Sequence, residues 1–208
     1  MEVSFGGKLI YEFKDRKIFQ INNGNLVIRF IINNFSAANI VNLLFAAEHI
    51  EINTCFKRQI NQNEIEIIPL ELSPVMYRVT ARASKDTAQS LGIEHGYKIY
   101  PHVGEWIFYS EALNYPVISE SYLHAFQLIS VEEIEYCKTQ SYKLFNFFTG
   151  FFVAKQCILG YMTFRFGKDD NNQLLLSAEF NSESLELWNI SNFTPIEQSD
   201  ENLFQILK

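Results

Sequence analysis

Alternating apolar and polar residues predict strands through the first third of the chain. In KLIYEF, residues 8–13, apolar side chains recur at every second position, which is typical of a half-buried strand. KIFQI and NLVIRFII follow on either side of an Asn-Asn-Gly-Asn turn, and we expect them to pair as a hairpin over about 17–32. The second of these strands is apolar on both faces apart from Arg29, so we expect it inside a sheet.

Helices and further strands follow this hairpin. Apolar residues at helical spacing predict a helix over 37–48, with Ser36 as its N-cap. A second, short helix begins at Ser84 and ends at Gly92, a residue that tolerates a left-handed backbone. Between these helices the pattern predicts a meander of three strands, at 50–56, 63–68 and 75–83.

Charged residues occupy one face of two strands in this meander. Arg78 and Arg82 alternate with apolar residues in the last strand. Glu64 and Glu66 alternate with isoleucines in the preceding one. Antiparallel pairing of the two strands would place these glutamates opposite the arginines, so we expect cross-strand ion pairs.

The strongest helix signal covers about residues 131–154. Ser130 and Glu133 form a capping-box pattern at its start. Its first half is amphipathic, whereas its second half, LFNFFTGFFVA, is apolar almost all round, so we expect Phe148 to be fully buried. The stretch 144–164 carries one charge and approaches the length of a bilayer span, but strand formers fill its second half, which favours a buried helix followed by a strand.

The whole pattern predicts an α+β fold. We expect antiparallel sheets built from N-terminal and C-terminal meanders, packed against the long aromatic helix at about 131–154 and shorter helices. Two strands flank the turn sequence GKDDNN, and a short helix ends the chain. Because no repeat or linker rich in Pro, Gly or Ser is visible, we expect a single globular domain over residues 1–208. The place where we would expect a subdivision is near 84–104.

Composition agrees with a globular protein. Nineteen Phe and ten Tyr in 208 residues, with 20% charged residues, exclude a disordered chain. Three cysteines without a C-x-x-C pair exclude a disulfide framework and a cysteine-based zinc site. The start of the chain lacks the pattern of a signal peptide, so we expect a cytoplasmic location.

Charge is distributed unevenly along the chain. Residues 1–104 carry 10 Asp and Glu against 11 Lys and Arg, whereas residues 105–208 carry 14 against 6. An acidic half disfavours contact with nucleic acid and anionic membranes and favours a basic protein partner. We therefore expect neither nucleic acid nor a membrane as a partner.

No short motif in the chain carries a known chemistry. The sequence contains no nucleophile elbow, phosphate-binding glycine loop or zinc-protease helix, so we predict no catalytic residue and no cofactor. His95, His102 and Glu105 are the closest approach to a metal-ligand set. Pro101 and Gly104 would break any helix that could align them, so we predict no metal site.

Aromatic residues over 97–109 form a better candidate for a binding surface. Flat amphipathic rings with a few polar groups suit ligand pockets and protein hot spots. Rings at alternating positions also pack a sheet edge against a core, and that alternative stays open. The candidate binding residues are Tyr97, Tyr100, His102, Glu105 and Trp106.

These observations lead to three functional hypotheses. The first is a cytoplasmic, non-catalytic binding protein whose acidic and aromatic surface, with Glu183, Glu186 and Glu197, engages a basic protein, as an immunity protein or antitoxin-type inhibitor does. The second is a small-molecule-binding domain or enzyme with a pocket lined by the aromatics of 97–109. The third is a structural subunit of an assembly. The sequence leaves the oligomeric state and the identity of any partner open.

Overall fold

The structure is a computed structural model that describes residues 7–13, 16–31 and 34–208. Residues 1–6, on which the expectation about a signal peptide rests, lie outside this description. The chain divides into two compact units. Unit 1 comprises Met1–Glu71, Gly167–Asn181 and Asp200–Lys208, and unit 2 comprises Leu72–Phe166 and Ser182–Ser199. The single domain expected over 1–208 stays a prediction. None of the positions at which the chain passes from one unit to the other lies within 84–104.

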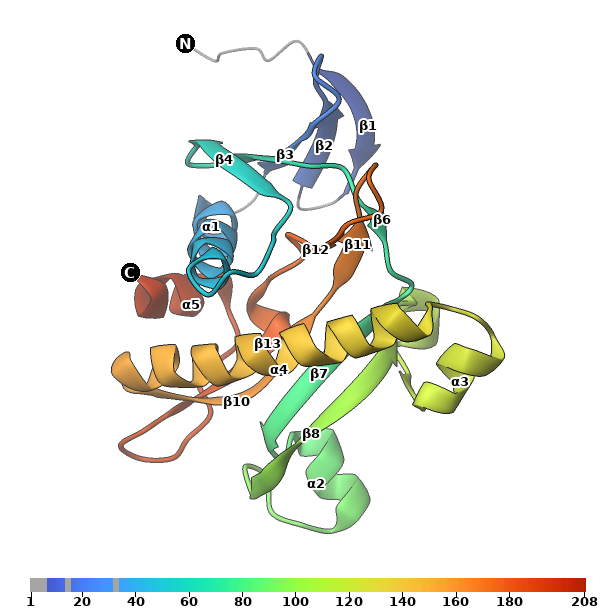
Figure 1. The fold of residues 1–208 in the computed structure, drawn as a ribbon. Helices are drawn as coiled ribbons and strands as arrows, with labels where there is room; N and C mark the ends of the chain where they lie inside the picture. Colours follow the sequence, from blue (N-terminus) through green and yellow to red (C-terminus); the bar gives the residue numbers. More distant parts are fainter. Residues whose placement is uncertain (1–6, 14–15, 32–33) are drawn as a thin grey trace. The chain divides into compact units, whose positions relative to one another are not determined.

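Unit 1 contains a five-stranded antiparallel sheet in the order β1-β2-β3-β5-β4 (Figure 1). The predicted hairpin is confirmed by β2 and β3, which pair from Arg16↔Phe30 to Gln20↔Leu26. Strand β3 lies between β2 and β5, which confirms its expected interior place. The strands are β1 (Lys8–Glu12), β2 (Arg16–Gln20), β3 (Leu26–Phe30), β4 (Phe56–Asn61) and β5 (Glu64–Ile67).

Helices α1 and α5 belong to the described part of unit 1. Helix α1 (Asn34–Glu48) confirms the helix predicted over 37–48 but begins earlier, and Ser36, the predicted N-cap, falls within its bounds. Helix α5 (Asp200–Leu207) packs against α1, and the buried Asn39 donates from Nδ2 to the carbonyl of Asp200 at 2.8 Å.

The prediction of a strand over 50–56 is wrong, because the chain forms a turn there. The amides of Ile50, Glu51 and Ile52 donate to carbonyls in the last turn of α1, and Glu51 has a left-handed φ of 60°. Regular pairing starts only at Phe56, the first residue of β4. A short three-stranded sheet has the order β12-β11-β6, with β6 (Glu71–Leu72), β11 (Phe166–Lys168) and β12 (Leu174–Leu176).

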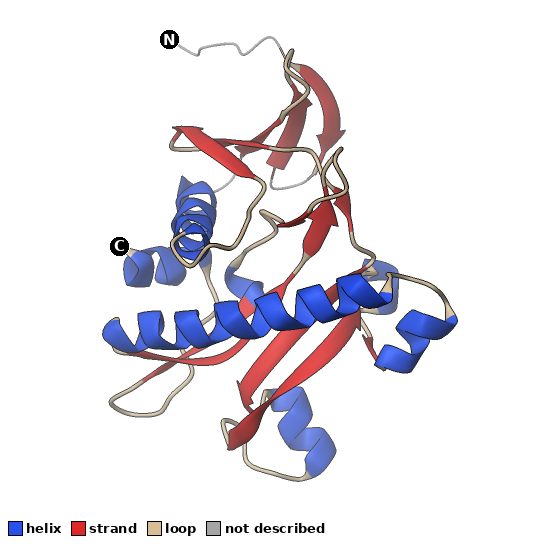
Figure 2. Cartoon of the chain, in the orientation of Figure 1, coloured by secondary structure: helices blue, strands red, loops and turns tan. Residues whose placement is uncertain are grey.

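Unit 2 is built on a second five-stranded antiparallel sheet in the order β13-β10-β7-β8-β9. Its strands are β7 (Val75–Arg82), β8 (Lys98–Phe108), β9 (Val117–Ile118), β10 (Cys157–Phe164) and β13 (Leu185–Asn189). Shorter helices connect them: α2 (Lys85–Leu91), η1 (Glu111–Leu113), α3 (Glu120–Ala125) and η2 (Ser182–Ser184). Figure 2 shows the alternation of helix and strand.

The long helix α4 (Val131–Ala154) packs against β10 and β7 of this sheet. The capping box of Ser130 and Glu133 is present, which confirms the predicted start. Phe148 is fully buried, as expected. Among the helices that the structure describes, none combines the length and apolarity needed to cross a membrane. The fold is therefore mixed α+β, with antiparallel sheets and one long helix.

The cross-strand pairs expected between Arg78, Arg82, Glu64 and Glu66 are wrong. Strands β5 and β7 belong to different sheets, so they do not pair with each other. The side chains find partners elsewhere: Glu64 with Arg29, Glu66 with Arg58, Arg78 with Glu105, and Arg82 with the carbonyl of Gly96. Strand order, which local patterns do not encode, decides these pairs.

Candidate functional site

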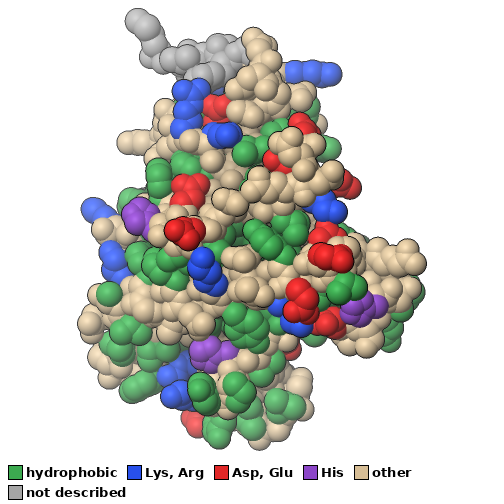
Figure 3. All heavy atoms as spheres, viewed as in Figure 1, with side chains coloured by type: hydrophobic (Ala, Val, Ile, Leu, Met, Phe, Trp, Pro, Cys, Tyr) green, Lys and Arg blue, Asp and Glu red, His purple; other side chains and the backbone are tan. Residues whose placement is uncertain are grey.

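The three acidic residues predicted to share a surface differ in exposure. Glu183, on η2, and Glu197 are exposed, whereas Glu186, in β13, is only 9% exposed. On the face shown in Figure 3, Asp and Glu side chains are spread among Lys, Arg and hydrophobic groups. Glu186 is therefore a buried carboxylate and not part of an exposed acidic surface.

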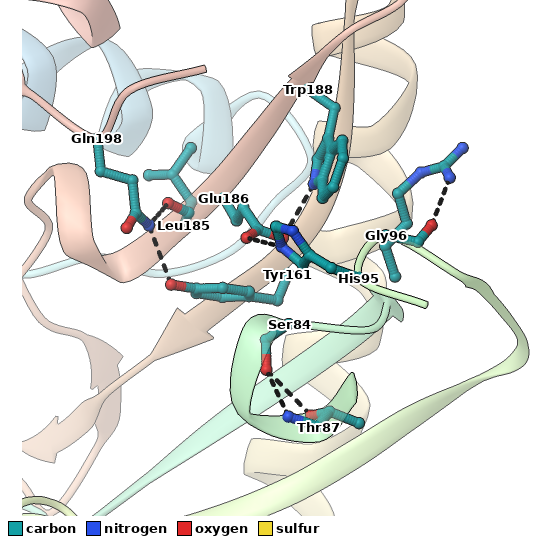
Figure 4. A network of polar contacts seen from close by, with 10 residues as sticks. Ser84, Thr87, His95, Gly96, Tyr161, Leu185, Glu186, Trp188 and Gln198 are labelled. Carbon is teal, nitrogen blue, oxygen red and sulfur yellow. Dashed lines mark hydrogen bonds and ion pairs between the residues drawn. The ribbon is translucent and has the colours of Figure 1, made fainter. Parts of the chain in front are cut away.

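Glu186, Trp188 and His95 form a compact cluster in unit 2, named here the Glu186 cluster (Figure 4). Glu186 and Trp188 are two apart in β13, which puts them on one face of the strand. Trp188 donates from Nε1 to Glu186 Oε2 at 2.9 Å. The Nε2 atom of His95 lies 3.4 Å from Glu186 Oε1. The centroids of the His95 and Trp188 rings are 4.7 Å apart.

Two glycines make room for this cluster. A Cβ built on Gly160, in β10, would lie 2.6 Å from Glu186 Oε2 and 3.0 Å from Trp188 Nε1. A Cβ on Gly96, which has a left-handed φ of 81°, would lie 2.5 Å from Trp188 Cη2. Any larger residue at either position would force the indole or the carboxylate to move. The two glycines thus leave the space that the Trp188 and Glu186 side chains occupy.

The Glu186 cluster borders a hollow of about 520 Å³, named here the Glu186 hollow. Gln198 donates from Nε2 to Tyr161 Oη at 3.0 Å and to the carbonyl of Leu185 at 2.8 Å. These two hydrogen bonds link Gln198 to strands β10 and β13. Burial raises the pKa of Tyr161, so its hydroxyl stays protonated near neutral pH. The residues that line the Glu186 hollow include Ser84, Lys85, Asp86, His95, Tyr161 and Glu186.

A second hollow of about 590 Å³ in unit 2, named here the Tyr97 hollow, gathers part of the predicted aromatic set. Tyr97, Tyr100 and Glu105 all line it. Tyr100 is 84% exposed, so its ring is available to a ligand. Glu105 accepts from the Arg78 guanidinium, with Nη2 2.9 Å from its Oε2. The Arg78 guanidinium thus holds the Glu105 carboxylate, which lines the hollow.

The other two predicted binding residues lie elsewhere in unit 2. The His102 ring packs against Phe145 of α4, with centroids 5.2 Å apart, and burial, reinforced by the charge of Lys98, lowers its pKa. Trp106 is 4% exposed and packs edge-on against Tyr77. For these two residues the open alternative, packing against a core, describes their surroundings.

Metal-ligating side chains do not converge in the described chain. His95, His102 and Glu105 each contact a different partner: Glu186, Phe145 and Arg78. Within residues 7–13, 16–31 and 34–208, no group of three or more His, Cys, Asp or Glu is arranged to hold a metal ion. Burial raises the pKa of the Cys55 and Cys137 thiols to about 12, which keeps both unreactive.

Comparison with known proteins decides the family. The sequence profile described as SAICAR synthetase matches residues 20–204 of this chain. The chain belongs to the SAICAR synthetase family. Similar curated proteins include the phosphoribosylaminoimidazole-succinocarboxamide synthase of Thermoanaerobacter sp. (strain X514), which is 25% identical over 95% of this chain and 90% of the relative. The synthase of Staphylococcus aureus (strain JH9) is 24% identical over 86% of this chain and 84% of the relative.

Solved structures of this family share the fold. The synthase of Ehrlichia chaffeensis superposes with a TM-score of 0.84 at 22% identity, covering 96% of this chain and 94% of that chain. A type-2 SAICAR synthetase in complex with ADP has a TM-score of 0.83 at 19% identity, covering 95% and 94%. The enzyme of Saccharomyces cerevisiae complexed with SAICAR has a TM-score of 0.73 at 13% identity, covering 96% and 82%.

The family overturns the leading functional hypothesis. The hypothesis of a non-catalytic immunity protein or inhibitor that engages a basic protein is wrong, since the profile and the curated relatives are those of an enzyme. The acidic excess misled because Glu186 is buried in a cluster of its own unit. The second hypothesis, a small-molecule-binding domain or enzyme, agrees better with the family. The relationship, at 24–25% identity, is too distant to be evident from a single sequence. The cytoplasmic location stays a prediction.

Proposed function

We propose that this chain is a small-molecule enzyme with the activity for which its curated relatives are named, the synthesis of phosphoribosylaminoimidazole-succinocarboxamide. The observation that carries the proposal is the family match over residues 20–204, supported by relatives that align along nearly their whole length. The second hypothesis from the sequence, a pocket enzyme, is thereby extended to a reaction class.

The product name defines the chemistry. It describes an amide that joins a phosphoribosylaminoimidazole carbonyl group to the nitrogen of an amino derivative of succinate. Formal hydrolysis of that amide gives an aminoimidazole carboxylate and aspartate. Amide formation from a carboxylate and an amine in water needs an activated carboxylate. ATP supplies such activation by transferring its terminal phosphoryl group to the carboxylate oxygen, so that amide formation releases ADP and phosphate. We propose that this chain binds an adenine nucleotide, as the type-2 relative does in its ADP complex.

The two hollows of unit 2 support a small-molecule function. Their volumes of about 520 and 590 Å³ lie within the range of about 300–1,000 Å³ that is usual for ligand pockets. We propose that Tyr97 and Tyr100 contact a planar heterocycle at the Tyr97 hollow, because exposed aromatic rings stack well on such groups. Glu105, held by Arg78, is available there as a hydrogen-bond acceptor.

The test is product formation by the purified full-length chain. The chain is incubated with the aminoimidazole carboxylate ribotide, aspartate and ATP, and mass spectrometry follows the succinocarboxamide and ADP. We expect both products to appear together and to require ATP. A folded protein, verified by circular dichroism, that forms neither product and binds no ADP in calorimetry would contradict the proposal.

A pair of variants tests the part played by the Tyr97 hollow. Tyr100→Ala should lower kcat/KM by about tenfold, since stacking of a base on an aromatic ring is typically worth about 1–3 kcal/mol. Leu113→Ala is the matched control, because Leu113 is 62% exposed on η1 and lies outside both hollows. Equal activity of the two variants would remove Tyr100 from the ligand site and leave the reaction class untouched.

A further inference from the structure

Glu186 is a buried carboxylate with unused hydrogen-bonding capacity. Its side chain is 12% exposed, and burying a charged group is costly unless donors compensate it. From the described residues, Trp188 Nε1 donates to it at 2.9 Å, and His95 Nε2 lies at the longer distance of 3.4 Å. Two carboxylate oxygens can accept about four hydrogen bonds, so acceptor capacity remains beside the hollow that Glu186 lines.

The cations around the Glu186 hollow do not offset this charge. Arg78 is paired with Glu105, and Arg82 donates to the carbonyl of Gly96 at 2.9 Å. Of the described residues that line the hollow, Lys85 is the one lysine or arginine, whereas Asp86, Glu186 and Glu197 supply three carboxylates. Such a lining repels a phosphate and attracts groups that carry N–H donors.

The geometry of the cluster is pre-organised. Gly160 leaves the space that Glu186 Oε2 and Trp188 Nε1 occupy, and Gly96 leaves the space for the indole ring. The indole N–H holds one carboxylate oxygen in place, as Figure 4 shows. A ligand group that binds here does not have to immobilise the acceptor first, which favours affinity.

We propose that the Glu186 hollow binds the amino end of a small ligand, with the Glu186 carboxylate accepting its N–H hydrogen bonds, and that the ligand's phosphate binds elsewhere. Hydrogen bonds to an ionised acceptor are stronger than those between neutral groups, so this contact selects for an amino group. The inference rests on the proposed function in one respect: the ligand is a small molecule that carries both an amino group and a phosphate.

The test uses two probes that differ only in a phosphate, aminoimidazole carboxamide riboside and its monophosphate. Binding is read from the indole N–H signals in a heteronuclear NMR spectrum of the full-length chain. The chain has two tryptophans, so Trp106 serves as an internal reference for Trp188, and Trp106→Phe assigns the two signals. We expect the riboside to shift the Trp188 signal and leave that of Trp106 in place. The monophosphate should shift the same Trp188 signal, because its phosphate binds outside the hollow.

Two carboxamide variants separate recognition by Glu186 from the general negative charge of unit 2. Glu186→Gln should weaken binding of the riboside by about tenfold or more, because a hydrogen bond to a charged acceptor is lost. Glu111→Gln is the matched control: it removes an exposed carboxylate of unit 2 that lines neither hollow, and we expect a change below about twofold, as solvent screens an exposed charge.

Several results would overturn the proposal. They are a Trp188 signal that the monophosphate moves and the riboside does not, a Trp188 signal that neither probe moves, and a Glu186→Gln variant that binds as the unmodified chain does. The comparison of the two probes uses the unmodified chain, so it holds even if Glu186→Gln fails to fold. Product formation is measured separately. An active enzyme without a Trp188 response would contradict this inference alone, whereas a Trp188 response without product would contradict the proposed reaction alone.

Discussion

Glu66 in unit 1 and Glu186 in unit 2 are both buried carboxylates on strands, but their surroundings differ. Glu66 accepts from Asn25 Nδ2 at 2.7 Å, Arg58 Nε at 2.7 Å and Asn23 Nδ2 at 3.2 Å. The hydrogen bond from Asn25, aided by those from Arg58 and Asn23, holds the pKa of Glu66 below its ordinary value. Glu186 has one indole donor and a more distant imidazole, and it lines a hollow.

This difference separates a structural carboxylate from a ligand-binding one. The donors of Glu66 come from side chains of its own unit, and they satisfy most of what its two oxygens can accept. Replacing Glu66 should therefore cost stability and spare ligand binding. Glu186 keeps acceptor capacity for a group from outside, so its replacement should cost binding more than stability. The following variants test this division.

Phe148→Ala should give the largest loss of stability and sets the scale for unit 2. The side chain is fully buried in α4, so its removal loses transfer free energy and leaves a cavity, for a cost of about 3–5 kcal/mol. Denaturant unfolding measures the change. Phe147→Ala is the matched control, since Phe147 is only half-buried on the same helix. Equal losses for both variants would show that α4 is not anchored through Phe148.

Glu66→Gln should destabilise unit 1 by about 1–3 kcal/mol at neutral pH, because its donors lose a charged acceptor. The folded pKa lies below the ordinary value of 4.5, so this stabilisation is present above pH 4.5 and is lost as the pH falls through the folded pKa. Stability measured from pH 7 downward should therefore fall less steeply in the variant. Glu71→Gln, at an exposed position, should reproduce the slope of the unmodified chain. A steep fall that persists in Glu66→Gln would show that another group governs the acid response.

Gly160→Ala tests whether the backbone positions Glu186. The added Cβ would lie 2.6 Å from Glu186 Oε2, so the carboxylate must shift, at a cost of about 1–3 kcal/mol in stability. Binding of aminoimidazole carboxamide riboside should weaken together with stability. Gly150→Ala, where a Cβ meets nothing within 4 Å in α4, should instead stabilise the chain by about 0.5–1 kcal/mol. Unchanged riboside binding in Gly160→Ala would mean that ligands do not contact the Glu186 carboxylate.

Local signals in the sequence predict local structure well. The capping box of Ser130 and Glu133 and the apolar spacing after it predict α4 with the bounds that the structure has. The hairpin of β2 and β3 follows from its turn residues in the same way. Each of these elements depends on residues a few positions apart, so a single sequence contains the information.

The candidate site depends on contacts that no local pattern encodes. His95 and Glu186 are 91 residues apart along the chain, and Arg58 is the partner of Glu66 because β4 and β5 are neighbours. An acid-rich second half suggests an exposed surface until the fold buries Glu186. Sequence inspection singled out Glu186, Tyr97 and Tyr100 as candidate residues, but it could not tell that they line two different hollows.

Glu183→Lys should have the smallest effect and tests whether charge alone explains the Glu186 hollow. Glu183 lies three residues before Glu186 but is exposed, so we expect stability to change by less than about 0.5 kcal/mol. Riboside binding, read from the Trp188 signal, should stay within about twofold of the unmodified chain, because solvent and salt screen an exposed charge. If charge reversal at Glu183 weakened binding as much as Glu186→Gln does, long-range attraction would account for the ligand preference, and the buried carboxylate would lose its special role.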